Sequence, residues 1–350
     1  MFLSPSSSSG GASSGSRQSA LPTLFTSGAG EVFIIDGALF ARGRPTSSLH
    51  LCARAASPHE LLCAKVYDAT TAAEEAAERE ASCGRAVRDA LAPASVGETH
   101  ETGLVRFAVE GALADGRRIV VMPHYLLSLA DVTQRFLQRA SQGLPARNLA
   151  QLAVGLAVAL RTMHALGLAH CDVKPASVML RSDGWPVLVD LAAATRFGEP
   201  PAEVTRRWVV AESPAAASAL LGSATPALDL HCLAATVFCA FLGSDNEVAV
   251  GRLPSHGWRG RERGGSSSAG SPAPPAPAEE QVEAEAVART CWERRIGSAA
   301  ELAAALAAVA RSNAFRDGSG DGGGGGGGGG AGGDAAQQLI SDDELRRWGV

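Results

Sequence analysis

The residues of this chain that could carry chemistry gather in one stretch, from residue 170 to residue 192. Asp172 and Lys174 stand there on a loop, and a second aspartate, Asp190, follows an apolar run. Between them, two short β-type runs flank an Asp-Gly turn at 183–184, which predicts a hairpin. A hairpin brings the loop before its first strand close to the residue after its second strand. We therefore expect both acids and the lysine at one rim.

Two carboxylates and a lysine at one rim suit a cation and a polyphosphate. One acid would bind the metal, and the other would orient a nucleophile. The alternative is an ordinary hairpin whose acids are solvated turn residues.

This stretch resembles the catalytic loop and metal-binding strand of eukaryotic-type protein kinases, in which H-R-D-x-K-P-x-N is followed by two strands and D-F-G. The chain reads H-C-D-V-K-P-A-S from residue 170 and D-L-A from Asp190, with the same order and spacing. Three family positions differ: Cys171 stands for Arg, Ser177 for Asn, and Leu-Ala at 191–192 for Phe-Gly.

The resemblance implies a role for each of these side chains. Asp172 would accept or orient the substrate hydroxyl, and Lys174 would balance the charge of the γ-phosphate. Asp190 and Ser177 would bind Mg²⁺, although Ser177 is shorter than asparagine and lacks its amide.

Length and composition fit one domain with two lobes. The chain has 350 residues, of which 46% are hydrophobic, and this is enough for a sizeable core. A formal net charge of -5 argues against a broad nucleic-acid-binding surface. The 7 cysteines are scattered, so we expect a reduced, cytoplasmic setting rather than disulfides or a zinc site. No apolar run reaches about 18 residues, so no membrane span is expected.

The N-terminal segment, residues 1–30, is rich in Ser and Gly, and Arg17 is its only charged residue. Such a composition cannot bury a core, so we expect this segment to be disordered. A Ser-rich segment that is poor in acids also fits an organellar transit peptide. Such peptides are rich in arginine, however, and this segment has only one.

Residues 33–67 alternate apolar and turn-like stretches, as an antiparallel sheet would. The strand pattern at 61–67 contains one charge, Lys65, and the segment 71–91 that follows is Ala- and Glu-rich and helical in pattern. In the kinase family, a lysine in this place grips the phosphates of ATP and a glutamate of the next helix holds it. The resemblance assigns these roles to Lys65 and Glu80. Alternatively, Lys65 snorkels to solvent and the glutamates form one solvated face.

The remaining nucleotide contacts are also implied by the resemblance. The family's glycine-rich loop corresponds to residues 41–48, where Gly43 is the only glycine and Pro45 has no N–H to donate to phosphate. The strand pattern at 120–125 resembles the adenine-binding hinge, whose backbone C=O and N–H fall on Pro123 and Tyr125. An ordinary strand–loop–helix join would look the same. Met179 would lie under the adenine, and core packing explains it equally well.

Helical patterns dominate the rest of the chain. Apolar spacing at 149–163 predicts a core helix that Gly167 ends. Asp229 begins an apolar helix, where it is either an N-cap or, by the resemblance, a brace for the catalytic loop. Residues 283–311 are helical in pattern again. Residues 254–280 read as a disordered insertion, and 313–350 as a glycine-rich linker with a short terminal helix.

We therefore expect an α+β, bilobal, protein-kinase-like fold. Its N-lobe, residues 31–127, would be small and β-rich with one helix, and its C-lobe, residues 128–312, would be larger and mainly helical. No apolar or basic surface in the sequence indicates a membrane or nucleic-acid partner, so the expected partners are ATP and a protein.

Two functions are open. The first is a protein kinase that binds ATP and Mg²⁺ and transfers the γ-phosphoryl group to Ser or Thr of a protein substrate at a reduced rate. The Lys-Pro pair at 174–175 resembles the serine/threonine-directed branch. The second is a pseudokinase, a non-catalytic interaction module. It is favoured by the loop proline, by Cys171 and Ser177, by the lost Phe-Gly, and by the lost glutamate where the family's A-P-E falls on 216–218.

Two further expectations concern regulation. Gly84 falls where the family places a bulky helix residue that supports the active form. Cys171 cannot grip a phosphate as arginine does, so phosphorylation at the candidate sites is not expected to be a required switch. These candidates are Thr195, Thr205 and Ser213. Arg295, which would have paired with the lost glutamate, needs another acid such as Glu212 or lies exposed.

Overall fold

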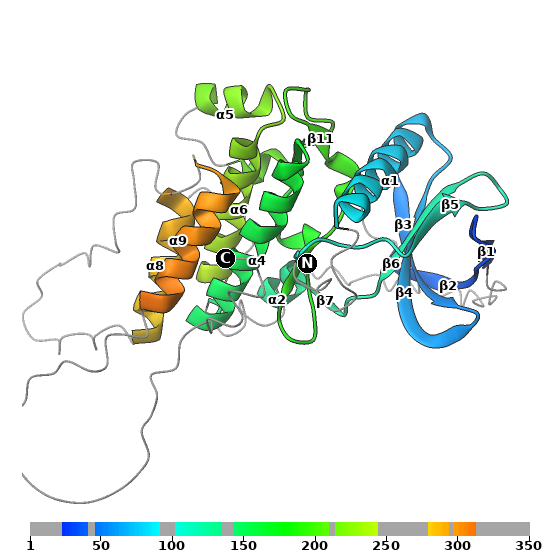
Figure 1. The fold of residues 1–350 in the computed structure, drawn as a ribbon, viewed down its shortest axis with the longest axis horizontal. Coiled ribbons are helices and arrows are strands. Elements are labelled where there is room, and N and C mark those ends of the chain that lie inside the picture. Colours follow the sequence, from blue (N-terminus) through cyan, green and yellow to red (C-terminus); the bar gives the residue numbers. More distant parts are fainter. Residues whose placement is uncertain are drawn as a thin grey trace, which may run out of the picture.

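The structure is a computed structural model that describes residues 23–40, 46–91, 102–134, 143–209, 214–243, 279–293 and 297–312. These residues form two lobes (Figure 1), one built on a β-sheet with helix α1 (Thr71–Leu91) and the other mainly helical. The expected α+β, bilobal architecture is therefore confirmed. The loop that contains Gly43 lies outside the described residues, as do residues 1–22 and 313–350.

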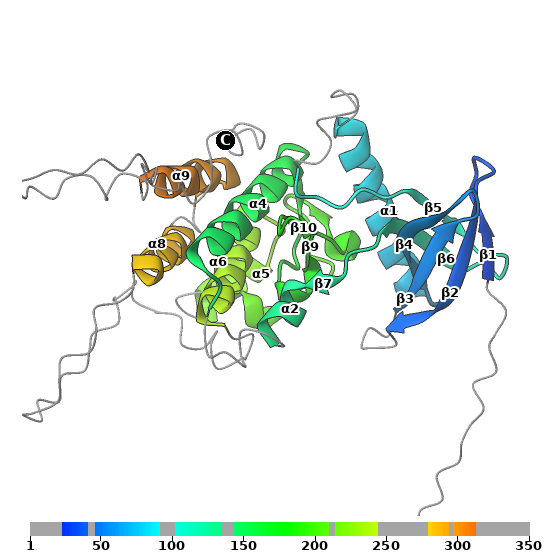
Figure 2. The same ribbon diagram turned by 90° about the horizontal axis from the view of Figure 1, so that it is seen from below.

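The N-lobe is a six-stranded antiparallel sheet in the order β1-β2-β3-β4-β6-β5. Its strands are β1 (Thr23–Thr26), β2 (Val32–Phe40), β3 (Ser47–Arg54), β4 (Ser57–Tyr67), β5 (Val109–Ala112) and β6 (Arg118–Pro123). One face of the sheet has a small core of its own, which contains Phe33, Ile35, Leu62 and Val121. Figure 2 shows α1 on the side of the sheet that faces the helical lobe.

The expectation that all of residues 1–30 are disordered is wrong at its end, because β1 pairs with β2 along its whole length. Phe25 is 3% exposed, and its ring centroid lies 5.8 Å from that of Phe33. An edge strand needs one buried face and the ladder hydrogen bonds of a single neighbour. The average composition of the segment concealed this short apolar run.

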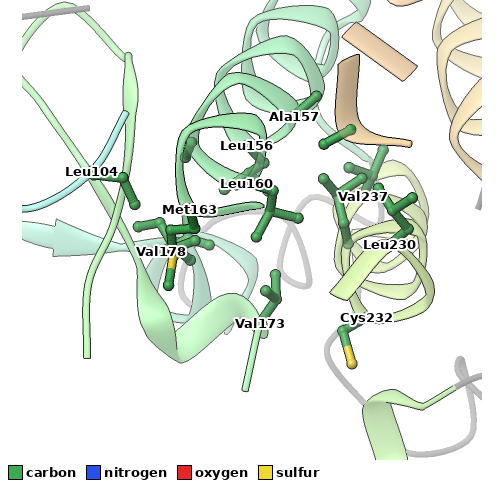
Figure 3. Packing of buried hydrophobic residues seen from close by; sticks show 14 of the residues in the cluster. Leu104, Leu156, Ala157, Leu160, Met163, Val173, Val178, Leu230, Cys232 and Val237 are labelled. Carbon is green, nitrogen blue, oxygen red and sulfur yellow. The ribbon is translucent and has the colours of Figure 1, made fainter. Parts of the chain in front are cut away.

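The helical lobe is built around α4 (Ala146–Ala165), which supplies many of the fully buried side chains. Helix α6 (Pro226–Leu242) packs on one side of it, and α8 (Glu279–Glu293) and α9 (Ala299–Ser312) lie at the end away from the sheet (Figures 1 and 2). Two short helices, α2 (Leu129–Val132) and α5 (Pro214–Leu221), complete the described helices of this lobe. Figure 3 shows α4 beside the stretch 170–192 and α6, through Leu160, Met163, Val173, Val178, Leu230 and Val237.

The predicted hairpin is present as β9 (Val178–Leu180) and β10 (Pro186–Leu188), and β7 (Leu127–Ser128) adds a third strand. A second small sheet pairs β8 (Leu168–Ala169) with β11 (Thr195–Arg196). The hairpin packs closely on α4 at Gly155, where a Cβ would lie 2.4 Å from Cγ of Pro186. Glycine at this position therefore sets the distance between the hairpin and the core helix.

The C-terminal helical pattern differs from the expectation in its boundaries. Helix α8 already begins at Glu279, inside the expected insertion 254–280, and the helical pattern over 283–311 corresponds to two helices. A capping box starts the second helix, because Ser298 Oγ accepts from the Glu301 N–H and Glu301 accepts from the Ser298 N–H. Such caps favour a new helix start over continuation.

Within the described residues, no single helix combines the length and apolar composition that crossing a bilayer requires. The helices at 215–221 and 226–242 reach that length and composition only as a pair, and they are bent by 116°.

Candidate active site

Lys65 of β4 lies between two carboxylates that come from different parts of the fold. Its Nζ is 2.6 Å from Oε2 of Glu80, on α1, and 2.7 Å from Oδ1 of Asp190, after β10. Lys65 is 6% exposed and Glu80 is fully buried. The predicted pair Lys65–Glu80 is therefore present, and the lysine does not snorkel to solvent.

Burial works against the charge of Lys65, but its two neighbouring acids outweigh burial. Desolvation lowers the pKa of the ammonium, whereas Asp190 and then Glu80 raise it, and together they hold the pKa well above its usual value. The lysine is thus a fixed cation that joins the two lobes. It offers a positive charge to an anion that approaches Asp190.

Tyr67, which the sequence analysis did not single out, completes this cluster. Its hydroxyl donates to Oε2 of Glu80, and Nζ of Lys65 lies 5.1 Å from its ring centroid. Burial, followed by the charge of Glu80, raises the pKa of the Tyr67 hydroxyl. Alternate residues of a strand point to the same face, so its position two residues after Lys65 was the available signal.

Asp190 stands at a sharp turn into the 3₁₀-helix η3 (Leu191–Ala193) and has a left-handed backbone, with φ of 68°. Helix α1 binds the backbone of this turn at two places. Oε1 of Glu80 accepts from the Leu191 N–H at 3.2 Å, and Nε of Arg79 donates to the Ala192 carbonyl at 3.0 Å. The orientation of Asp190 is thus set jointly by β10 and α1.

The loop that carries Asp172 is anchored from below by Asp229. The buried carboxylate of Asp229 accepts from the backbone N–H groups of His170 and Cys171, each at 2.8 Å, and from Nε2 of His164 at 2.9 Å. Helix α6 instead takes Thr225 as its N-cap, so the N-cap interpretation of Asp229 is wrong. An acid in the first turn of a helix can serve a neighbouring loop when another residue caps the helix.

The anchored loop has a left-handed residue of its own at Cys171, with φ of 64°. The Cys171 side chain is fully buried, and burial raises the pKa of its thiol. The imidazole of His170 spans the loop, because Nδ1 accepts from the Asp172 N–H at 3.3 Å and Nε2 donates to the Val189 carbonyl at 3.0 Å. This imidazole links the loop before the hairpin to the strand end before Asp190.

Asp172, Lys174 and Thr205 form a second polar cluster. Nζ of Lys174 lies 2.5 Å from Oδ2 of Asp172 and 2.9 Å from Oγ1 of Thr205. Oγ1 of Thr205 is 2.6 Å from Oδ1 of Asp172, and the Thr205 N–H donates to the same oxygen at 3.2 Å. Thr205 was considered in the sequence only as a phosphorylation site, because nothing local relates it to a loop 31 residues earlier.

The Ser177 side chain contacts the backbone of the Asp172 loop. Its fully buried hydroxyl donates to the Asp172 carbonyl at 2.6 Å and lies 3.3 Å from the Lys174 carbonyl. The hydroxyl therefore fixes the shape of the loop. Any bond to a metal would have to use a lone pair of the same oxygen.

The donors present fit Mg²⁺ bound together with a polyphosphate. Mg²⁺ usually takes one or two carboxylates, substrate phosphates and water rather than a cage of protein ligands. Asp190 supplies such a carboxylate at the rim. The part of the chain that the structure describes contains no group of three or more His, Cys, Asp or Glu side chains that could hold a metal ion.

The proposed adenine contacts lie where the two lobes join. Pro123 ends β6 opposite Leu62, and the N–H of the next residue donates to the Leu61 carbonyl at 3.3 Å. Tyr125 is half-buried against the main core, and Met179 is half-buried in β9, where it pairs with Ser128. These positions are compatible with a hinge and leave the adenine assignment a prediction. Gly43 cannot be placed.

The segment after Asp190 keeps its described hydroxyl groups engaged. Thr195 is 7% exposed and its hydroxyl donates to the Ala193 carbonyl at 2.9 Å. Residues 216–218, to which the A-P-E pattern was assigned, lie within α5. Ser213, Glu212 and Arg295 lie outside the described residues, so the pairing of Arg295 stays a prediction.

Comparisons with known proteins point in one direction. No family model matches the chain. Over 136 residues, 38% of this chain, the sequence is 38% identical to the serine/threonine-protein kinase PknK of Mycobacterium tuberculosis, and the same holds for that of Mycobacterium bovis. The chain covers 12% of the length of these relatives.

The fold itself is similar to solved protein kinases. Vaccinia related kinase 3 matches with a TM-score of 0.55 at 16% identity, over 85% of this chain and 93% of that one. The ROP18 kinase domain, solved with AMP-PNP and sucrose, matches with a TM-score of 0.53 at 16% identity, over 82% and 83%. The chain thus has a protein-kinase-like fold, and it resembles the eukaryotic-type protein kinase superfamily.

Proposed function

We propose that this chain is a protein kinase domain that binds ATP with Mg²⁺ and transfers the γ-phosphoryl group to Ser or Thr of a protein. The observation that carries the proposal is the position of Lys65 Nζ, 2.6 Å from Glu80 and 2.7 Å from Asp190. A buried lysine held between acids from both lobes is costly to build for stability alone, since buried ion pairs often contribute little. It is the arrangement that phosphoryl transfer requires.

Each polar group then has a defined task. Lys65 binds the α- and β-phosphates, and Glu80 keeps its ammonium in place. Asp172 orients the substrate hydroxyl and accepts its proton, while Lys174 balances charge on the transferred phosphoryl group. Mg²⁺, when bound by Asp190, would neutralise the phosphate oxygens.

Direction toward Ser and Thr is supported by the second polar cluster and by the relatives. Lys174, which the resemblance associates with the serine/threonine-directed branch, is hydrogen-bonded to both Asp172 and Thr205. The PknK relatives are named serine/threonine kinases. Binding of an ATP analogue by the ROP18 domain supports the same nucleotide here by analogy of fold.

One observation favours the alternative of a pseudokinase. The Ser177 hydroxyl is held in place by its hydrogen bond to the Asp172 carbonyl, and serine is shorter than the asparagine that makes the family's second metal contact, which weakens that contact. Losing one electrostatic contact of this kind typically costs roughly 10²–10³ in rate. A slow enzyme and a nucleotide-binding scaffold are therefore the two outcomes to separate.

The test is phosphotransfer from labelled ATP with Mg²⁺ to casein or to the chain itself, together with thermal shift by ATP–Mg. Asp172→Asn removes the proton acceptor, and Asp183→Asn in the exposed hairpin turn is the matched control. We expect transfer by the wild type and by Asp183→Asn, with a loss of about 10²-fold or more in Asp172→Asn. A thermal shift without transfer would select the pseudokinase, and neither signal would exclude both.

A further inference from the structure

Two consecutive residues of α1 bind the backbone of the turn after Asp190. Glu80 accepts from the Leu191 N–H at 3.2 Å, and Arg79 donates through Nε to the Ala192 carbonyl at 3.0 Å. The helix therefore presents an acceptor and a donor to neighbouring peptide groups of one turn. Only the acceptor, Glu80, already has a role in the proposed chemistry.

The turn depends on such contacts because of its local conformation. Asp190 has φ of 68°, a left-handed conformation that is unfavourable for a non-glycine residue. Leu191, Ala192 and Ala193 are buried, and the hydrogen bond from Arg79 to the Ala192 carbonyl is partly buried. A partly buried carbonyl that loses its donor carries part of a desolvation penalty, so the Arg79 N–H stabilises this particular conformation of the turn.

The other charge near Arg79 competes little for its guanidinium. Nη1 lies 3.9 Å from Oε2 of Glu75, one helical turn earlier, and Glu75 is 66% exposed. The Nε hydrogen bond is thus the closer and better oriented of the two interactions. The side chain of Arg79 itself is 34% exposed, so it can be replaced without opening the core.

We propose that Arg79 is a positioning residue, which holds the Asp190 turn against α1 and thereby supports binding of the Mg²⁺–nucleotide complex. The proposal rests on the proposed function for its nucleotide part. In this proposal, a side chain of α1 anchors the segment that has Leu-Ala where the kinase family has Phe-Gly. The contact made by Arg79 requires no phosphate group. Cys171, which stands where the family has a phosphate-gripping arginine, is buried and cannot grip a phosphate.

The test compares two substitutions of nearly equal length. Gln at position 79 keeps an N–H donor at the place of Nε, whereas Met is as long and has none. Glu75→Ala is the control for the loose ion pair. For each protein, AMP-PNP affinity is measured with Mg²⁺ and with EDTA, and hydrogen exchange is followed at the amides of residues 190–194.

In Arg79→Met, we expect faster exchange at these amides and a loss of roughly tenfold in the affinity gained by adding Mg²⁺, the size expected for one hydrogen bond. Affinity in EDTA should change little. Arg79→Gln and Glu75→Ala should remain within about threefold of the wild type, which corresponds to about 0.7 kcal/mol.

Equal exchange in Arg79→Met and the wild type would overturn the proposal, as would a Gln variant that behaves like the Met variant. A wild-type chain that binds no AMP-PNP would instead refute the proposed function. Hydrogen exchange would still decide whether Arg79 holds the turn.

Discussion

Tyr67 gives the buried Glu80 a neutral hydrogen-bond donor beside the charged one from Lys65. The carboxylate is fully buried, so each donor offsets part of its desolvation. The Tyr67 hydroxyl therefore stabilises a residue of the candidate site without taking part in the proposed reaction.

Tyr67→Phe should lower the free energy of unfolding by about 1–3 kcal/mol, because a buried carboxylate loses a donor. Urea unfolding measures this, with Tyr125→Phe, the other tyrosine, as the control. The free energy of AMP-PNP binding should change by less than the free energy of unfolding, since Lys65 and Glu80 remain paired. An unchanged unfolding free energy would mean that the hydroxyl contributes nothing to this site.

Thr205 is the second residue-scale feature, because its hydroxyl contacts both Asp172 and Lys174. Thr205→Ala should reduce phosphotransfer about tenfold or more, while Thr205→Ser, which keeps the hydroxyl, should stay near the wild type. Initial rates at saturating ATP are the measurement. If Ser and Ala variants are equally slow, the methyl group rather than the hydroxyl matters.

At the scale of elements, α1 touches the segment before β5 through an unusual pair. A Cβ on Gly84 would lie 2.1 Å from the ring of Phe107, so the ring occupies the space that a larger helix residue would need. The bulk missing at position 84 is therefore supplied by Phe107. The lost helix side chain is not by itself evidence of an empty or inactive interface.

This exchange of volume predicts a specific coupling. Gly84→Leu should destabilise by about 1–3 kcal/mol through overpacking, and Phe107→Ala should destabilise by leaving a void. The double variant should be more stable than the sum of the two effects predicts, by 0.5 kcal/mol or more as an order-of-magnitude estimate. A double-mutant cycle of urea unfolding measures the coupling, and simple additivity would contradict it.

At the scale of the whole molecule, all seven cysteines are free thiols, and most lie in the two cores. Burial raises the pKa of the Cys52 thiol from 9.0 to about 11. Burial is also the main cause that raises the pKa of Cys63 to about 11 and that of Cys83 to about 12. Burial likewise raises the pKa of the Cys171, Cys232 and Cys291 thiols. The fold therefore favours the neutral form of these six thiols.

These shifts predict alkaline instability with a definite sign. Above pH 9.0, unfolded thiols lose protons that folded thiols keep, so the unfolded state binds fewer protons and stability falls as pH rises. The slope is up to about 1.4 kcal/mol per pH unit for each such thiol. Urea unfolding under reducing conditions from pH 7.5 to pH 10.5 measures it, and Cys291→Ala should reduce the slope. A flat profile would contradict the prediction.

The sequence by itself determined the main secondary-structure elements and which polar residues each element carries. The Asp-Gly turn fixed the hairpin, and strand and helix periodicity fixed β4, α1 and α4. The pairing of Lys65 with Glu80, fifteen residues apart, was predicted from the resemblance to the kinase family, in which a lysine on a strand meets a glutamate of the next helix. These features depend on local backbone preferences and on patterns of 2.0 and 3.6 residues, which a single chain displays openly.

Only the tertiary structure decided the partners that come from elsewhere in the chain. Arg79 meets Ala192 across 113 residues, and Thr205 meets Asp172 across 33. β1 and the Phe107 contact belong to the same group. Such contacts arise from how finished elements pack, and packing depends on the shapes of many side chains together, so no local pattern encodes it.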